Sequence, residues 1–242
     1  YVQEIASALK GVDIPVFVKN PIHPEIGLWL GAFERLNKAG VNRLAAIHRG
    51  FYNYKESAFR NDPKWEMPIK LREQARDLPI ICDPSHIAGK SSLVEDVSQI
   101  AMDINLDGLM IETHNKPASA LSDSQQQVTP HELKGFLTNL ILRDTKLSYE
   151  IFKDELLTFR NQIDLLDCQI IELLNDRKKI VEEIAKFKNK NKLTIFQIER
   201  WFEILESRKS IANRLSLDHQ MVSEIFELIH KYSILTQTKI MR

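Results

Sequence analysis

Pro79-Ile80-Ile81-Cys82-Asp83-Pro84-Ser85-His86 joins a short apolar run to a polar one, and this junction decides the fold of the first part of the chain. An apolar run of this length between turn signals is typical of a buried β-strand. The same pattern recurs at residues 15–18, 43–47 and 108–111. Helical patterns flank the four runs, at residues 2–10, 26–38, 67–74 and 93–105. The alternation predicts βα units with a parallel sheet, and the near-continuous apolar strands predict that the sheet is covered on both faces.

Each of these strands is followed directly by polar residues, which are expected to converge because the carboxyl ends of parallel strands meet at one edge. Lys19 and Arg49 are cations that could hold a phosphate or a carboxylate. One imidazole and two carboxylates, from His86, Glu112 and Asp123, suit a divalent ion such as Mn, Fe, Co or Zn. The alternative interpretation is that these side chains only cap strands and helices.

Composition limits the remaining possibilities. The chain has 242 residues, enough for one or two domains, and its 33 Lys+Arg balance 33 Asp+Glu, which argues against nucleic-acid binding driven by charge. No apolar run approaches the roughly 18 residues that span a bilayer. The two cysteines, Cys82 and Cys168, cannot form a disulfide framework, which favours a reducing cytoplasm. No signal peptide is visible, and a helical pattern begins almost at Tyr1, so we expect the chain to start partway through a larger protein.

Glycine and proline divide the chain in two. All nine Pro lie at or before Pro130, and all eight Gly lie at or before Gly135. Because both residues punctuate turns and interrupt helices, their absence from the rest of the chain predicts long helices there. We therefore expect an α/β domain at 1–142, a linker at 143–152 and an all-α domain at 153–242.

The all-α domain should open with one helix over residues 148–189. Its apolar side chains step by three and four, as in a heptad seam: Leu156, Phe159, Ile163, Leu166, Ile170, Leu173, Ile180, Ile184 and Phe187. Arg177 takes the seam position after Leu173. Since a buried unpaired charge costs several kcal/mol or more, an anion should lie there, unless Arg177 snorkels or pairs with a Glu of another helix. Lys188 lies about three turns further on, on nearly the same face, and could bracket a small dianion with Arg177.

A helix of some 40 residues is about 60 Å long, which is too long for a compact monomer of this size. An intertwined homodimer would cover the apolar seam along its whole length. Arg160 lies about 25 Å before Arg177 on the same helix. It could therefore reach the same small ligand only from the antiparallel helix of a partner subunit.

Two shorter helices should follow the long one. The second is predicted from Thr194, which has the spacing of a capping box with Gln197. The third should run from the N-cap Asp218 to about position 240. Its apolar face continues into Ser233 and Gln237, whose polar groups need partners, either in a ligand or in the helix backbone and water.

The first domain resembles a known family in the order and spacing of its motifs over about residues 1–140. The similar segments are Lys19-Asn20, His48-Arg49-Gly50, Asp83-Pro84-Ser85-His86, Glu112 and Ala120-Leu121-Ser122-Asp123-Ser124-Gln125-Gln126-Gln127. They resemble 3-deoxy-D-arabino-heptulosonate 7-phosphate (DAHP) synthase of the short bacterial type. The resemblance implies the second half of a (β/α)8 TIM barrel, with four βα units, and condensation of phosphoenolpyruvate with erythrose 4-phosphate. It makes Lys19 and Arg49 ligands of phosphoenolpyruvate, and His86, Glu112 and Asp123 ligands of a divalent metal that polarises the aldehyde.

The chain departs from this family in the extent of its barrel. A full barrel has eight strands in about 250 residues. The family's cysteine ligand from an early strand and its early Lys-Pro-Arg-Thr segment have no counterpart here. Cys82, four residues before His86, is interpreted as a buried core residue. We therefore expect the 242-residue chain to lack a condensing activity that the full-length protein has.

Residues 153–241 resemble the all-helical chorismate mutase family, a dimer of three-helix protomers. The similar segments are Leu156-Leu157-Thr158-Phe159-Arg160, Leu165-Leu166-Asp167, Leu173-Leu174-Asn175-Asp176-Arg177, Lys188, Glu199-Arg200 and Ser233-Ile234-Leu235-Thr236-Gln237. The resemblance implies conversion of chorismate to prephenate without metal or cofactor. Arg177 and the partner subunit's Arg160 would clamp the two carboxylates, and Lys188 and Gln237 would contact the ether oxygen.

The same resemblance gives supporting roles to Arg200 and Ser233 and places Gln197 and Glu199 in the substrate-binding set. Two positions depart from the family pattern. Gln197 stands where the family often has Asp, and Trp201 stands where a Glu commonly helps to bind the substrate hydroxyl. An indole offers only an N–H donor, so the sequence leaves open how the hydroxyl is recognised here.

The leading interpretation is an α/β plus all-α chain: a truncated DAHP synthase fused to a chorismate mutase, in the cytoplasmic synthesis of aromatic amino acids. A competing interpretation makes the helical domain a non-catalytic module that dimerises, senses chorismate or prephenate and regulates the synthase. A third makes the first domain the related octulosonate phosphate synthase, which the fusion to a mutase disfavours.

Overall fold

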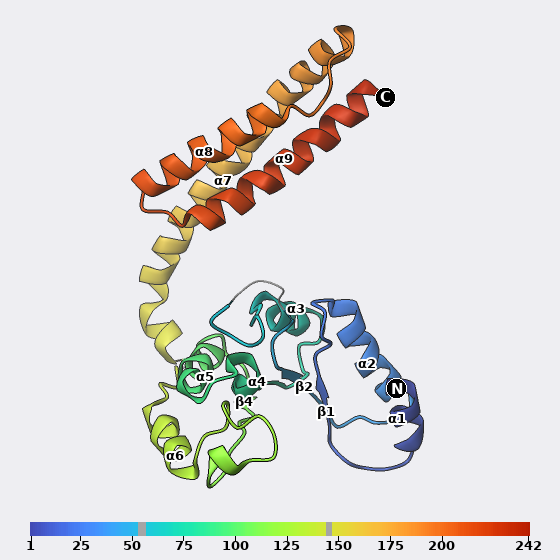
Figure 1. Cartoon of the computed structure of the whole chain (residues 1–242), viewed down its shortest axis with the longest axis vertical. Coiled ribbons are helices and arrows are strands. Elements are labelled where there is room, and N and C mark those ends of the chain that lie inside the picture. Colours follow the sequence, from blue (N-terminus) through green and yellow to red (C-terminus); the bar gives the residue numbers. More distant parts are fainter. Residues whose placement is uncertain (53–56, 144–146) are drawn as a thin grey trace. The chain divides into compact units, whose positions relative to one another are not determined.

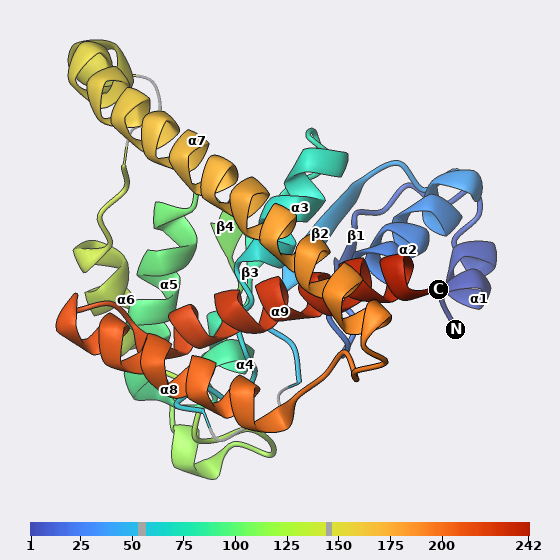
Figure 2. The same cartoon turned by 90° about the horizontal axis from the view of Figure 1, so that it is seen from above.

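The computed structural model describes residues 1–52, 57–143 and 147–242, without the side chains of 147–151, and the chain divides into two compact units (Figures 1 and 2). The units are Tyr1–Thr145 and Lys146–Arg242. Their division falls within the expected linker 143–152, of which residues 144–146 lie outside the described residues. Within the described part, no helix is both long and apolar enough to cross a bilayer.

The described residues of the first unit form a sheet of four parallel strands in sequential order, β1-β2-β3-β4. The strands are β1 (Val16–Lys19), β2 (Leu44–His48), β3 (Ile80–Cys82) and β4 (Gly108–Leu109). The predicted parallel sheet is confirmed, with each strand at its predicted place. The apolar runs had placed Lys19 and His48 just after their strands, but each is the last residue of its strand.

Helices pack beside this sheet and supply most of its core. They are α1 (Val2–Ala8), α2 (Ile26–Lys38), α3 (Glu66–Gln74), α4 (Pro84–Ala88), α5 (Val94–Asp103) and α6 (Pro130–Asn139), with 3-10 turns η1 (Ser91–Leu93) and η2 (Pro117–Ser119). Trp29 of α2, Leu71 of α3 and Val97 of α5 join Ile80 and Cys82 of β3 in one buried cluster. The interpretation of Cys82 as a core residue is confirmed.

The expectation that the sheet is covered on both faces is wrong for its first strand. Residues of β1 alternate between half-buried and exposed, and the Phe17 side chain is 46% exposed. β1 lies at one edge of the described sheet, where it pairs with β2 alone. In β2, by contrast, Ala45, Ala46, Ile47 and His48 are all buried.

The second unit consists of α7 (Leu147–Lys190), α8 (Ile198–Arg214) and α9 (His219–Met241), and α9 packs against both of the others (Figure 1). The long helix that the sequence predicts is present, with non-helical backbone angles at Phe152. Asp218 caps α9 as predicted, since its Oδ1 accepts a 2.7 Å hydrogen bond from the Met221 N–H.

The predicted capping box at Thr194 is wrong, because α8 begins four residues later, at Ile198. Gln197 is its N-cap residue and makes no side-chain capping bond. The Thr194 hydroxyl donates instead to the carbonyl of Phe196. Lys188 donates at 2.6 Å to the carbonyl of Ile195, so that this carbonyl is bound by a side chain of α7 and takes no part in a helix.

Helix α9 does not cover the apolar seam of α7. All nine seam residues are exposed, from 38% at Leu156 to 68% at Leu173. Among the residues of α7 whose side chains are described, those that are buried are Val181 and Ala185, one position after Ile180 and Ile184. The stripe of larger side chains beside them remains uncovered within the described chain.

Candidate active sites

The first candidate site starts at the junction of β3 and α4. Asp83 caps α4: its Oδ1 accepts from the His86 backbone N–H at 3.1 Å. Its Oδ2 lies 2.8 Å from Nδ1 of His86 and 3.1 Å from Nζ of Lys19. Burial raises the pKa of Asp83, but the hydrogen bonds from His86 and Lys19 outweigh burial and hold it below its usual value. An ionised Asp83 therefore fixes the imidazole with Nε2 turned away from it, the arrangement common around metal-binding histidines.

The three predicted metal ligands come together at the carboxyl edge of the sheet. One ligand atom each of His86, Glu112 and Asp123 lies within 4.8 Å of the other two. Nε2 of His86 is 3.6 Å from Oε1 of Glu112, and Gln126 donates to Oε2 of Glu112 at 3.0 Å. Asp123 has a φ of 51°, a conformation that Asp adopts more readily than most residues. A donor set of one imidazole and two carboxylates fits a divalent transition metal.

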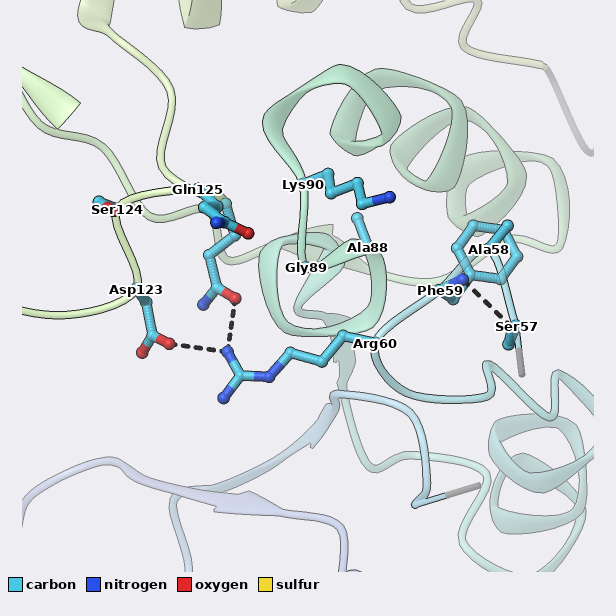
Figure 3. A pocket seen from close by; sticks show the side chains of 11 residues that line it. Ser57, Ala58, Phe59, Arg60, Ala88, Gly89, Lys90, Asp123, Ser124 and Gln125 are labelled. Carbon is cyan, nitrogen blue, oxygen red and sulfur yellow. Dashed lines mark hydrogen bonds and ion pairs between the residues drawn. The ribbon is translucent and has the colours of Figure 1, made fainter. Parts of the chain in front are cut away.

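Arg60, which the sequence analysis did not single out, bridges two of the residues at this site (Figure 3). Its Nη1 donates to Oδ1 of Asp123 and to Oε1 of Gln126, both at 2.7 Å. The hydrogen bond from Arg60 holds the pKa of Asp123 below its usual value. Gly89, with φ +69°, ends α4 beside Arg60, and a side chain there would collide with it. Arg60 also lines, with Lys90 and Asp123, a cavity of about 500 Å³.

The remaining polar residues at the strand ends play unequal parts. Asn20 is buried; it accepts from the Arg49 N–H at 2.7 Å and donates to the Gly50 carbonyl at 2.8 Å, which ties the loop after β2 to the end of β1. His48 is fully buried beside Trp29, Phe51 and Trp65. Burial lowers the pKa of His48 to about 4, so that it is neutral at pH 7. The expected convergence thus holds for the polar residues at the ends of β1, β3 and β4. The charge of Arg49, just after β2, acts on Asp123, while His48 belongs to the core.

The second candidate site joins α7 to α9 in the helical unit. Nη1 of Arg177 donates at 2.6 Å to Oγ of Ser233, which itself donates to the Ile229 carbonyl at 2.8 Å. Gln237, one turn further along α9, is buried, and its Nε2 lies 3.4 Å from the Ser233 carbonyl. Burial, together with Arg208, lowers the pKa of Arg177, which remains a cation at any ordinary pH. Among the described residues its hydrogen bond is to a neutral hydroxyl, and a half-buried guanidinium so placed can bind an anion.

Lys188 extends this site along the same helix. It is half-buried. Burial lowers the pKa of His230 on α9, and the positive charges of Arg177 and Lys188 lower it further. Two cations on one face of α7, with Ser233 and Gln237 opposite them on α9, can hold a small dianion.

The other predicted residues lie outside this cluster. Arg200 forms a surface ion pair with Glu203 at 2.8 Å. Gln197 and Glu199 are exposed at the start of α8. Arg160 is exposed on α7, 17 residues before Arg177, a separation of about 25 Å along a helix.

The first unit is a parallel α/β assembly whose polar site lies at the carboxyl ends of its strands, as in barrel enzymes. Residues 2–148 match the family model of the DAHP synthetase I family, and the chain belongs to that family. Residues 159–238 match the model of chorismate mutase type II. The chain thus carries a DAHP synthase domain followed by a chorismate mutase domain, the combination that the sequence predicted.

Relatives of known name divide between the same two regions. Phospho-2-dehydro-3-deoxyheptonate aldolase of Thermotoga maritima is 31% identical over 114 residues, 47% of this chain and 33% of the relative. Bifunctional chorismate mutase/prephenate dehydratase of Buchnera aphidicola subsp. Schizaphis graminum is 38% identical over 89 residues, 37% of this chain and 23% of the relative. The chain therefore spans a third or less of the length of either relative.

A solved structure agrees with the assignment of the first unit. A truncated form of 3-deoxy-D-arabino-heptulosonate 7-phosphate synthase from Thermotoga maritima superposes with a TM-score of 0.51 at 27% identity, covering 57% of this chain and 52% of that one. The likeness supports a partial barrel of the DAHP synthase type.

Proposed function

We propose that the helical unit of this chain rearranges chorismate to prephenate, and that the site between α7 and α9 performs the reaction. The observation that carries the proposal is the half-buried Arg177, held by Ser233 beside a buried Gln237, with Lys188 on the same side of α7. The match of residues 159–238 to chorismate mutase type II supports it.

The residues suit the chemistry of this rearrangement. The reaction is a unimolecular Claisen rearrangement, which needs no nucleophile and no metal. It needs the substrate held in a compact conformer, with donors placed where negative charge grows on the ether oxygen. Arg177 would bind one carboxylate, and Lys188 and Gln237 would donate to the ether oxygen. Ser233 keeps the guanidinium of Arg177 in place.

We propose that the working form is a homodimer through α7. Nine exposed apolar residues form one stripe along that helix, and such a stripe is typical of a helix that packs against another. An antiparallel partner helix would cover the stripe and bring the partner subunit's Arg160 to the second carboxylate. Arg200, Gln197 and Glu199 would complete the site from the start of α8 once the substrate is bound.

For the first unit we propose the metal-dependent condensation of phosphoenolpyruvate with erythrose 4-phosphate, in a full-length cytoplasmic enzyme. Lys19 and Arg49 would hold phosphoenolpyruvate, and His86, Glu112 and Asp123 would hold a divalent ion. When bound, the ion would polarise the aldehyde as a Lewis acid. The 242-residue chain, with four strands described where a barrel has eight, should not condense the two substrates by itself.

The experiment that tests the mutase is loss of chorismate absorbance with the purified chain in the presence of a metal chelator. Turnover to prephenate is expected, because the proposed reaction at the site between α7 and α9 needs no metal. Binding of chorismate without turnover would contradict the catalytic proposal and favour the sensing module.

Replacing Asp83 by Asn tests the metal site without any assay of activity. Asn remains a good N-cap residue for α4, but it removes the charge that orients His86. We expect the affinity for Mn²⁺, measured by calorimetry, to fall about ten- to a hundredfold, the usual effect of losing such a partner. Asp77→Asn, at an exposed position just before β3, is the matched control and should bind as the unaltered chain does. Equal affinities for Asp83→Asn and the unaltered chain would refute the metal assignment.

A further inference from the structure

His230 of α9 neighbours the second site, since the charges of Arg177 and Lys188 act on its ring. It precedes Ser233 by three residues and Gln237 by seven, so that all three lie on one face of the helix. Its ring stacks on Trp201 of α8, with the ring centroids 4.1 Å apart and the planes at 23°. The edge of Phe196 meets it on another side, at 5.8 Å and 60°.

Two polar atoms on this face of α9 are buried without a hydrogen-bond partner among the described residues. They are Nε2 of His230 and Oε1 of Gln237. A buried polar group that lacks a partner costs roughly 1–3 kcal/mol, and each such group calls for an explanation. Among the described residues the others are both ring nitrogens of His48, in the core, and Oε1 of Gln127. The atoms of His230 and Gln237 lie on the helix face that carries Ser233, the partner of Arg177, and a ligand bound along this face would complete their hydrogen bonding.

The surroundings of His230 favour the neutral form of its imidazole. Burial lowers its pKa, and the positive charges of Arg177 and Lys188 lower it further. A neutral imidazole has one N–H donor and one acceptor nitrogen. It adds no third cation for the carboxylates of a dianion, but it can give or take a hydrogen bond with a neutral polar group.

We propose that His230 contacts the substrate and binds the ring hydroxyl of chorismate through Nε2, with Trp201 holding the imidazole in place. The proposal rests on the mutase function proposed above. The carboxylates have the two arginines and the ether oxygen has Lys188 and Gln237, and the ring hydroxyl has no partner among these four residues. A hydroxyl both donates and accepts, and it therefore fits either tautomer of a neutral His230.

The stacking on His230 also gives a role to Trp201, which stands where the family commonly has Glu. An indole cannot accept a hydrogen bond from a hydroxyl. Its flat face can position the imidazole of a neighbouring helix, as the 4.1 Å stacking shows. Trp201 is thus a positioning residue, and His230 is the group that recognises the hydroxyl.

The test compares chorismate with an analogue that carries hydrogen in place of the ring hydroxyl, using the full chain and His230→Leu. We expect His230→Leu to lower kcat/KM for chorismate about tenfold, the effect of losing one hydrogen bond. With the analogue the two proteins should differ less than about twofold, because the contact is absent in both. His230→Gln keeps a donor and an acceptor and should recover part of the loss, and thermal melting shows whether each variant is folded.

His219→Leu is the matched control, since His219 is exposed at the start of α9, and it should behave as the unaltered chain on both substrates. An unchanged rate of His230→Leu on chorismate, or an equal loss on both substrates, would overturn the assignment. If the unaltered chain does not convert chorismate, the mutase proposal itself fails, and the role of His230 fails with it.

Discussion

Replacing Arg177 by Ala should lower kcat/KM for chorismate at least about a hundredfold, the range seen when an electrostatic group is removed from a preorganised site. The structure gives the reason: the guanidinium is half-buried, and its bond to Ser233 places it beside the buried amide of Gln237. Loss of chorismate absorbance measures the effect.

Arg214→Ala is the matched control for that variant. Arg214 is the last residue of α8 and is exposed, so its removal should leave the rate within about twofold. If Arg177→Ala kept more than a tenth of the unaltered activity while remaining folded, the site between α7 and α9 would not be the place of reaction.

Replacing Ile170 by Glu should convert the dimer to a monomer and abolish mutase activity together. Ile170 is 54% exposed in the middle of the apolar stripe of α7. In a dimer the new carboxylate would be buried unpaired, at a cost of several kcal/mol per chain. Activity would be lost because each site would lose the partner subunit's Arg160. Sedimentation gives the mass, and chorismate absorbance gives the rate.

Gln169→Glu places the same new charge one residue away, outside the stripe, and should leave both mass and rate unchanged. A monomeric Ile170→Glu with full activity would show that one chain holds a complete site. An unaltered chain that sediments as a monomer would contradict the proposed use of the stripe.

The sequence predicted the elements better than their contacts. Four β-strands and the long helix follow from apolar runs and from the distribution of Gly and Pro, both of which are local properties. The carboxyl-edge cluster of His86, Glu112 and Asp123 also follows, because parallel strands bring their ends to one edge. The burial of His48 does not follow, since it depends on Trp29, Phe51 and Trp65 from distant parts of the chain.

Arg60 and His230 were the residues that the sequence reasoning missed. Arg60 lies in the long loop between β2 and α3, where no periodicity marks it, and only the fold brings it to Asp123. His230 had a signal that could have been used: its spacing of three and seven from Ser233 and Gln237 puts it on the same helix face. The prediction of a capping box at Thr194 was wrong, because such a box is a local pattern. It carries no information about the contact of Lys188, on another helix, with the carbonyl of Ile195.

The measurement that tests the shared site most directly mixes Arg160→Ala and Arg177→Ala chains, each inactive alone, by refolding them together. A mixed dimer has one site with both arginines intact and one with neither. Random pairing makes about half of the dimers mixed, so the mixture should regain about a quarter of the unaltered activity. A mixture no more active than its separate components would contradict a site built from two subunits.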